Sequence, residues 1–529
     1  MSDTKKQSFL HGTMLLALST AIVKLIGAFY SIPLNAIIGE QGFGYYSTAY
    51  EIYTLLLMIS TAGLPVAMSR MISQASSLGH YRQVRKIYTV ARTVFLSLGL
   101  VGALLMTVFC KQLAAFQEQP DAWAAIGTLG PCCFLICLMS TYRGFFQGQS
   151  NMKPTSVSQV LEAVCKLIVG LSAAVLIGIY LKSTTFVAAG AIFGVTMSCL
   201  VSSFYLNRCF RKAYKEMPQT CEEVSSGKDI AKGLLAIAVP ITIGSAGLQL
   251  LTVLETKLYM SQLLEFMTQQ DADIQKGIYN FTQKIFNMPC AFITPITISV
   301  IPAITAQLTT GDHKGMKATE ESAARVAALI SAPCGVGLAV LAEPITSLLG
   351  GYQGERLALA ASLMTVLGIC ILFNALVLVT NAIMQAHGHV NYPVINMFIG
   401  GLVKLVAVFI LTGNPNIGIL GTPIGSLLCY LCITVLNLIT MRRILEHPPA
   451  IVRNVLRSCL AALLMGILTY GAWFGLTALG ITSRVILCGA PICVGAAVYV
   501  VAAVKLRAIT REDCLLLPKG EKIAKLLHL

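Results

Sequence analysis

The sequence predicts an all-α, polytopic membrane protein with fourteen transmembrane helices, in which two parallel six-helix repeats are followed by two C-terminal helices. Composition is the first observation behind this prediction. Of the 529 residues, 56% are hydrophobic and only 12% are charged, which is too apolar for a series of soluble domains. A spanning helix needs about 20 mostly apolar residues. The chain therefore has room for fourteen such helices, with short connections and no large soluble domain.

Fourteen apolar segments of sufficient length are the second observation. Their predicted limits are 9–37, 43–71, 87–112, 121–147, 154–180, 184–210, 232–263, 276–308, 317–341, 355–386, 391–412, 417–444, 451–477 and 482–506. The first segment does not resemble a cleaved signal, because Lys24 interrupts its apolar run and no small-residue cleavage site follows. We therefore expect it to be retained as the first helix.

The distribution of basic residues predicts the topology. Of the 38 Lys and Arg, 28 fall at the N-terminus, in alternate loops and at the C-terminus, and five fall within helices. The five on the opposite side are Lys111, Lys182, Lys276, Arg356 and Arg484. This asymmetry follows the positive-inside rule and places both termini in the cytoplasm. The net charge of +15 is thus a topology signal and not a sign of nucleic-acid binding.

Repeated residues at a nearly constant spacing are the third observation. Gln147 opens a polar turn and Lys166 follows it by 19 positions in the next apolar helix, and Gln385 and Lys404 repeat this pattern 238 positions later. Pro65 recurs 237 positions later as Pro302 in the eighth segment, and Gly44-x-Tyr46 recurs 233 positions later as Gly277-x-Tyr279. These identities predict a duplication of six segments, and an even number of spans makes both halves enter the membrane in the same direction.

The duplication and the polar stretches between segments predict the domain limits. They are an N-lobe at 1–212, a cytoplasmic linker at 213–231, a C-lobe at 232–446, the two additional helices at 447–507 and a cytoplasmic tail at 508–529.

Eight ionisable residues are predicted to lie inside the hydrocarbon region. They are Lys24, Glu51, Glu162, Lys166, Glu255, Lys257, Lys284 and Lys404. A Lys near the bilayer centre costs about 2.5–3.5 kcal/mol on insertion scales, so each should face water, a partner or a ligand. Five cations against three anions, on corresponding helices of the two halves, indicate a positively charged cavity between the lobes.

Structural pairing is the alternative to a functional role for these charges. Glu162 and Lys166 are four positions apart on one helical face, close enough to pair. For Lys24, Lys257 and Lys284 the alternatives are snorkelling to the membrane surface or pairing between lobes.

The sign of the predicted cavity suits an anionic ligand such as phosphate or pyrophosphate. Lys is a compact point charge, which favours release over tight bidentate capture. The chain contains no P-loop, no H-E-x-x-H and no G-x-S-x-G motif. Most of its 17 Cys are expected to be small, buried, apolar side chains. We expect no enzyme activity, no metal and no cofactor, with Na⁺ or H⁺ coupling left unassigned.

Three stretches carry a resemblance to a known family. RGFFQGQSNMKPTSVSQVLE (143–162), GLPVAMSRMIS (63–73) and the opening apolar segment (9–39) resemble the polysaccharide-transporter branch of the MOP exporter superfamily, of the stage V sporulation protein B, YtgP and MurJ types. The resemblance covers essentially the whole chain. The motif residues that it marks as candidates for gating are Pro65, Arg70, Arg143 and Gln147.

The resemblance implies two six-helix lobes around a central cavity and alternating access. Its implied cargo is a lipid-linked oligosaccharide, in particular an undecaprenyl-pyrophosphate sugar such as lipid II. Relatives carry cationic side chains on the first, second and eighth helices. Lys24 and Lys284 match this pattern, whereas the second helix carries Glu51, with Arg70 only near its cytoplasmic end. In relatives the last two helices form a groove for the lipid tail.

The resulting hypothesis is a flippase of the bacterial cytoplasmic membrane, in contact with membrane lipids and with cell-wall synthesis proteins as further partners. The alternative is a cation-coupled multidrug or metabolite exporter of the same superfamily. A scaffold for cell-wall synthases is a third class, and it predicts that neutralising the lysines has no effect.

Overall fold

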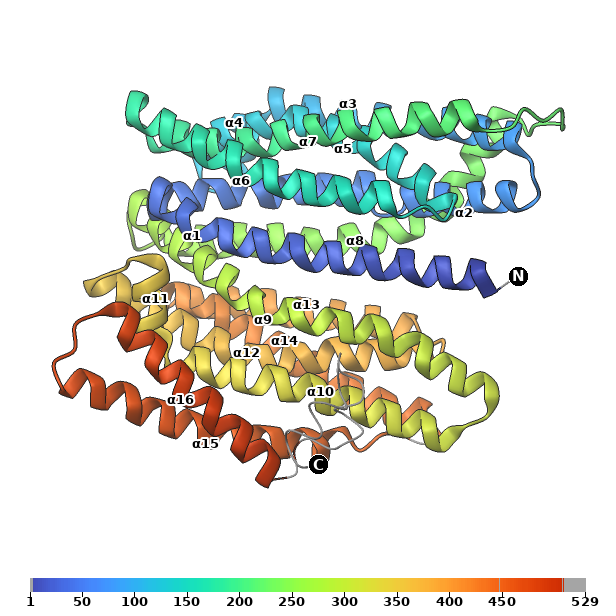
Figure 1. Cartoon of the computed structure of the whole chain (residues 1–529). Coiled ribbons are helices and arrows are strands. Elements are labelled where there is room, and N and C mark those ends of the chain that lie inside the picture. The colour runs from blue at the N-terminus through green and yellow to red at the C-terminus, as the bar shows by residue number, and fades with distance from the viewer. Residues whose placement is uncertain (1–2, 447, 507, 509–529) are drawn as a thin grey trace. The chain divides into compact units, whose positions relative to one another are not determined.

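The structure, a computed structural model, describes residues 3–446, 448–506 and 508. Within these ranges, the side chains outside the description are those of 3–18, 20, 21, 24, 25, 28, 60, 248, 294–299, 302 and 303. The described part of the chain is almost entirely helical and contains no strand (Figure 1). The predicted all-α fold class is therefore confirmed.

Contacts divide the chain into unit 1 (Met1–Gly277) and unit 2 (Ile278–Leu529). The helices of unit 1 are α1 (Asp3–Thr61), α2 (Leu64–Ser77), α3 (Tyr81–Val108), α4 (Cys110–Phe116), the short η1 (Pro120–Ala122), α5 (Trp123–Gly148), α6 (Lys153–Leu181), α7 (Thr184–Glu216) and α8 (Gly227–Leu263). Unit 1 also includes the first turns of α9 (Gln269–Thr310). The predicted lobes are defined by the repeat, which this division by contacts does not test.

Unit 2 begins within α9 and contains the remaining helices. They are α10 (His313–Val340), α11 (Ala342–Gly350), α12 (Gly354–Ala386), α13 (Asn391–Thr412), the short η2 (Gly418–Leu420), α14 (Gly421–Ile444), α15 (Ile451–Ala478) and α16 (Arg484–Lys505). In this unit α10 packs against α12 and α15, α13 against α14, and α15 against α16.

Two breaks in the backbone show how the predicted segments 9–37 and 43–71 are divided into helices α1 and α2. α1 continues from the first segment into the second, but Gly39 has φ +67° and ψ 177°, a conformation that essentially only glycine adopts cheaply. The turn that the sequence predicts between 37 and 43 is therefore located at Gly39. α2 begins two residues after α1 ends, with Pro65 in its first turn, where the missing N–H costs no hydrogen bond. The second predicted segment is therefore divided between α1 and α2 at this proline.

Small residues allow the closest helix packing in unit 1. α6 and α7 meet where Gly170 faces Gly194, and a Cβ on Gly194 would lie 2.3 Å from the Gly170 backbone. The opposite face of α6 is apolar yet exposed, for example at Ile168, Leu176 and Ile179. Apolar side chains on an outer face are expected of a helix that contacts lipid.

Twelve candidate membrane spans occur among the described residues. The first two predicted segments fall together in the span Phe29–Ser77, and α9, which covers predicted segment 276–308, includes side chains outside the description. A multi-pass membrane protein is confirmed, while the count of fourteen helices and the side of the termini stay predictions.

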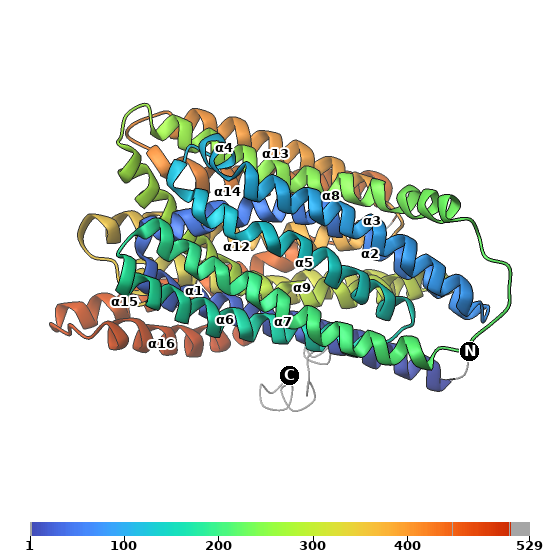
Figure 2. The same ribbon diagram turned by 90° about the horizontal axis from the view of Figure 1, so that it is seen from above.

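The predicted linker is the longest non-helical connection among the described residues of unit 1. α7 continues to Glu216 and α8 begins at Gly227, so the non-helical part is shorter than the predicted 213–231. Figure 2 shows it as the extended green segment between α7 and α8.

Candidate functional site

A cavity of about 320 Å³ lies inside unit 1, between α1, α5 and α6. Its polar and aromatic lining consists of Tyr30, Tyr50, Arg143, Gln159, Glu162 and Lys166. Three of these six residues belong to the stretch 143–162 that carries the family resemblance, and a fourth, Lys166, is one of the predicted intramembrane charges. The predicted cavity between the lobes, in contrast, stays a prediction.

Lys166 lies in a cage of tyrosines from α1. Its ammonium donates a hydrogen bond to the Tyr50 hydroxyl at 2.8 Å. The same nitrogen lies 4.5 Å from the ring centre of Tyr50, 5.2 Å from that of Tyr30 and 6.0 Å from that of Tyr46. Aromatic faces attract cations, and more strongly where water is excluded. This cage explains how a helix interior tolerates a lysine.

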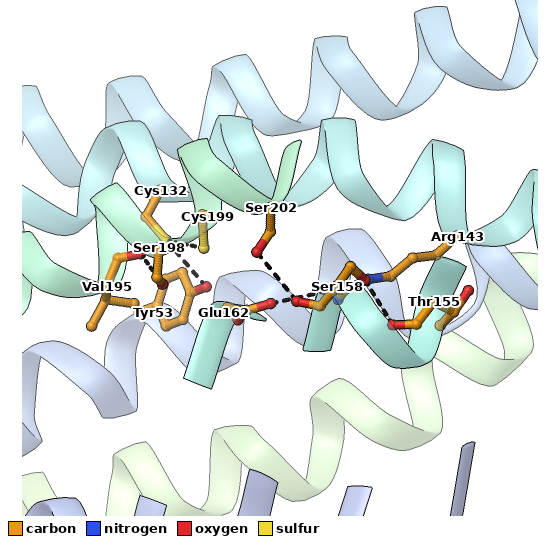
Figure 3. A network of polar contacts seen from close by, with 10 residues as sticks. All are labelled: Tyr53, Cys132, Arg143, Thr155, Ser158, Glu162, Val195, Ser198, Cys199 and Ser202. Atoms are coloured by element: carbon orange, nitrogen blue, oxygen red, sulfur yellow. Dashed lines mark hydrogen bonds and ion pairs between the residues drawn. The ribbon is translucent and has the colours of Figure 1, made fainter. Parts of the chain in front are cut away.

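Arg143 is the partner of Glu162. Its guanidinium donates to the Glu162 carboxylate at 2.9 Å and to the Ser158 hydroxyl at 3.1 Å. Figure 3 shows the Arg143 side chain extending toward Ser158 and Glu162. The Glu162 carboxylate is thus hydrogen-bonded to an arginine on the preceding helix, and its predicted pairing with Lys166 is present as an electrostatic interaction.

The net charge of the cavity lining follows from these contacts. The cavity lining holds two cations, Lys166 and Arg143, and one carboxylate, Glu162. One oxygen of the carboxylate pairs with the arginine, whereas the hydrogen-bond partner of the Lys166 ammonium is a neutral hydroxyl, with aromatic rings around it. The lining is thus net positive, which matches the predicted sign of the site.

Buried thiols lie beside the cavity, as Figure 3 also shows. The Sγ atom of Cys132 lies 3.4 Å from the Sγ atom of Cys199 and 3.4 Å from the Tyr53 hydroxyl. Both cysteines are fully buried. They contribute small apolar surface to the contact of α5 with α7, as predicted for cysteines in this chain.

A second polar cluster surrounds Lys276 at the start of α9. Lys276 is the first residue of predicted segment 276–308, at the end expected on the outer side of the membrane. α9 begins at Gln269, two turns earlier than predicted, so Lys276 lies within the helix and is 0% exposed. Its ammonium donates to the Thr48 hydroxyl and lies 3.9 Å from the Glu51 carboxylate.

Asp273, one turn before Lys276, joins the same cluster. Its carboxylate accepts hydrogen bonds from the Gln119 amide at 2.8 Å and from the Tyr45 hydroxyl at 3.0 Å. Gln119 in turn accepts from Thr48. The cluster therefore ties α9 to α1 and to the connection between α4 and η1.

Two glycines allow this close approach of α9 to α1. A Cβ on Gly44 would lie 2.9 Å from the carbonyl oxygen of Asp273, and a Cβ on Gly277 would lie 1.7 Å from that of Glu40. From the sequence alone, Gly44 and Gly277 are identified only as residues that recur in the two repeats. The structure shows that both positions require glycine, because the two backbones touch.

The remaining predicted charges are distributed over both units. The side chain of Lys24 lies outside the described residues, although Val23 and Gly27 line the cavity. Lys257 lies in α8 with its ammonium 4.2 Å from the ring centre of Phe116, away from the cavity lining. Glu255, on the same helix, is buried.

Lys284 and Lys404 lie in unit 2 and are half-buried. Lys404 is near enough to interact electrostatically with Tyr430 and Cys370. In unit 1 its repeat counterpart, Lys166, likewise has tyrosine and cysteine neighbours. The binding roles of all these lysines stay predictions.

The candidate gating residues occupy two helices. Gln147 and Arg143 lie on α5. Gly144, between them, packs against Pro65 of α2, and a Cβ added to Gly144 would lie 3.4 Å from the Pro65 backbone. Arg70 is exposed on α2. Contact between the two motif stretches is shown, and their role in gating stays a prediction.

Sequence reasoning also misses a charged pair in unit 2. Glu320 of α10 is 0% exposed, and its carboxylate lies 2.7 Å from Nε2 of His387, which follows α12. No spacing rule connects residues on two helices that are far apart in the sequence. The only available signal is an acidic residue two turns into an apolar helix.

Comparisons with known proteins agree with this architecture. The family model described as polysaccharide biosynthesis protein matches residues 9–307, and the model described as MatE matches residues 258–410. Among curated proteins, the chain is 26% identical over 413 residues to the lipid II flippase MurJ of Bacillus subtilis strain 168, covering 75% of this chain and 76% of that protein. It is also 26% identical over 450 residues to stage V sporulation protein B of the same organism, covering 83% and 85%.

Solved structures show the same fold. A structure of the lipid II flippase MurJ in an inward closed conformation aligns with a TM-score of 0.67 at 13% identity, covering 93% of this chain and 99% of that one. An inward-facing multidrug resistance MATE transporter of the MOP superfamily aligns with a TM-score of 0.62 at 15% identity, covering 80% and 97%. Since the polysaccharide biosynthesis protein model matches more than half of the chain, this protein belongs to the polysaccharide biosynthesis protein family.

Proposed function

We propose that this protein is a flippase that moves an undecaprenyl-pyrophosphate-linked sugar precursor, lipid II or a related oligosaccharide lipid, across the cytoplasmic membrane. The net positive cavity of unit 1 carries the proposal. A diphosphate that enters an apolar helix bundle needs fixed cations to replace its water. Relatives named as a lipid II flippase and as a sporulation protein support the same class of cargo.

In this proposal Lys166 and Arg143 bind the diphosphate. Lys166 supplies a charge that no carboxylate neutralises within hydrogen-bonding distance, and Arg143 offers a planar fork once it exchanges Glu162 for phosphate oxygens. In this proposal Lys24, Lys257, Lys284 and Lys404 are further contacts along the route. The lipid tail stays in the bilayer throughout.

Alternating access supplies the movement. The cluster around Lys276 holds α9 against α1 while the head group enters, and it separates when the site opens to the other side. Because the sequence contains no nucleotide-binding motif, the proposed driving force is the membrane potential or a Na⁺ or H⁺ gradient. One charge that crosses 100 mV gains about 2.3 kcal/mol.

Complementation and binding test the proposal together. A strain depleted of its lipid II flippases is expected to grow with the wild-type chain and not with Lys166→Gln. The matched control is Lys153→Gln, an exposed lysine on the same helix. In nanodiscs, undecaprenyl pyrophosphate should bind Lys166→Gln at least about tenfold more weakly, since a hydrogen bond to a charged group contributes about 1.5–3 kcal/mol. Equal growth and equal binding with both variants would contradict the proposal.

A cation-coupled exporter is the second candidate. The three tyrosine rings around Lys166 and the MatE match favour it. Glu162→Gln separates the two functions, because it removes the only carboxylate among the residues that line the cavity. Binding of a diphosphate lipid should be kept or strengthened by this change, whereas efflux of an organic cation should be lost. A scaffold without transport predicts no effect of either change.

A further inference from the structure

A second cavity of unit 1, with a volume of about 420 Å³, lies where α3, the linker and α8 meet. Its polar lining consists of Arg82, Arg85, Lys86, Thr89, Ser225 and Ser226. None of these residues lines the cavity around Lys166. We refer to this second cavity as the α3–α8 pocket.

The basic residues of the pocket share one face of α3. Positions 82, 85, 86 and 89 are separated by three, four and seven residues, which places them on one side of the first turns of a helix. Arg82 and Lys86 are exposed, and neither forms an ion pair within the described residues. This face of α3 therefore carries two exposed cations that have no direct ion-pair partner in the described part of the chain.

Arg85 is held in place at the back of the pocket. Its Nη2 donates to the carbonyl oxygen of Met217 at 2.9 Å, and its guanidinium lies 5.0 Å from the ring centre of Tyr214. The Nε atom of Arg85 is buried without a hydrogen-bond partner. The arginine is thus oriented in advance, with a donor that the protein itself does not use.

The opposite wall presents further donors. The Ser225 hydroxyl lines the pocket, and α8 begins there, so the backbone N–H groups of Gly227 and Lys228 have no acceptor within the helix, whereas that of Asp229 donates to the Ser226 hydroxyl. The carboxylate of Asp229 in this turn is occupied by the Ser226 hydroxyl at 2.7 Å. The walls therefore combine cations, hydroxyl groups and backbone N–H groups.

Hydrogen bonds fix the linker against α3 and so shape the pocket. Gln83 exchanges two hydrogen bonds with Ser225, at 2.9 and 3.1 Å, and its backbone N–H donates to the Glu222 carboxylate at 3.0 Å. Partial desolvation raises the pKa of Glu222, but hydrogen bonds from the Thr220 hydroxyl and from backbone N–H groups outweigh it and lower the pKa to about 2. The acidic residue closest to the pocket is therefore already engaged by backbone donors.

From this arrangement we infer that the α3–α8 pocket binds a phosphate group, independently of the flippase function proposed above. Several Lys and Arg side chains with hydroxyl and N–H donors are the usual surroundings of a phosphate. Both α3 and α8 are candidate membrane spans that begin at the pocket, which places it at the depth of lipid head groups. A phosphate-bearing lipid head group and free phosphate share this chemistry, and the experiment distinguishes them.

The test uses the full chain in nanodiscs that contain phosphatidylcholine with increasing fractions of phosphatidylglycerol. Lipid bound to the protein is measured by native mass spectrometry. Arg82→Gln/Lys86→Gln should bind phosphatidylglycerol about 30-fold more weakly, from about 1 kcal/mol for each basic residue near an anionic surface. Arg442→Gln/Arg443→Gln, which removes two exposed charges at the end of α14, should not change this binding.

Each outcome decides the inference. Loss that is confined to Arg82→Gln/Lys86→Gln supports a lipid head group. If inorganic phosphate binds the wild-type chain and not this variant, while the lipid binds both equally, the pocket takes free phosphate. Equal losses in both double variants indicate general surface charge, and no loss in either indicates no site, so both results would overturn the inference. An unchanged melting temperature of both variants shows that the fold is kept.

Discussion

Replacing Lys276 by methionine is expected to destabilise unit 1 strongly. Methionine fills a similar volume but removes the charge and all three N–H donors. Glu51 then loses the cation at 3.9 Å, and the Thr48 hydroxyl loses its ammonium donor. The carboxylate stays in a mostly buried position, with 16% of its side chain exposed.

The expected magnitude follows from this geometry. At 3.9 Å and an effective dielectric constant of about 20, the attraction of two unit charges is about 4 kcal/mol. Removing one member of a buried pair generally costs about 3–5 kcal/mol, because the other charge remains without compensation. Since Glu51 keeps some contact with solvent, we expect about 3 kcal/mol. For a unit of this size the melting temperature should fall by roughly 6 °C.

Tryptophan fluorescence can follow unit 1 alone. The chain has two tryptophans, Trp123 in α5 and Trp473 in α15, so the change Trp473→Phe leaves a reporter in unit 1 only. Thermal unfolding in nanodiscs should show the loss in Lys276→Met and not in Lys153→Met, which removes an exposed lysine.

The double variant tests the physical reason. Glu51→Gln/Lys276→Met removes both charges, and replacing a whole buried pair by neutral groups is often close to neutral. Asp273, which also interacts with Lys276, keeps its charge, so the melting temperature should recover a clear part of the loss and not all of it. A wild-type melting temperature for Lys276→Met, or no recovery in the double variant, would refute the assigned ion pair.

Two further predictions concern the backbone and the linker. Gly277→Ala should destabilise unit 1 by about 1–3 kcal/mol, because the added Cβ would lie 1.7 Å from a carbonyl oxygen of α1. Gly471→Ala, whose added Cβ would have no atom within 4 Å, should stabilise α15 by about 0.5–1 kcal/mol. Thermal unfolding of both variants measures this contrast. The lowered pKa of Glu222, about 2, means that its contribution to linker docking is complete above pH 4.5 and is lost as the pH falls toward 2. A spin label on the exposed Cys221, with the exposed Cys493 replaced by serine, should stay immobile from pH 8 to pH 5 and become mobile only below that range. Mobility that rises already between pH 8 and pH 6 would contradict the assigned hydrogen bonds.

Local chemistry makes the helices and their breaks predictable from the sequence. The predicted segment 391–412 coincides with α13, because long apolar runs bounded by polar turns have few alternatives in a membrane. Gly39 and Pro65 mark backbone breaks at positions where only their conformational properties fit. The predicted location of Lys166 in a polar site also agrees with the structure, since a costly charge in an apolar helix requires a compensating environment.

The partners of each charge depend on the tertiary structure. Spacing along one helix favours an ion pair between Glu162 and Lys166, but in the structure Arg143 on the neighbouring helix is the residue that hydrogen-bonds the carboxylate. The cage around Lys166 comes from tyrosines of α1, which lie more than a hundred positions away. Lys276 shows the same limit, because α9 starts two turns earlier than predicted, so that a residue expected at the helix end lies in the interior.

The sequence by itself determines that this chain is a bundle of membrane helices with positive charge inside it. Composition and periodicity are properties of the chain alone, and the bilayer accepts few structures that satisfy every backbone group. Only the tertiary structure decides which oxygen or aromatic ring each cation meets. Those contacts join residues from different helices, and helix packing selects among pairings that are equally compatible with the sequence.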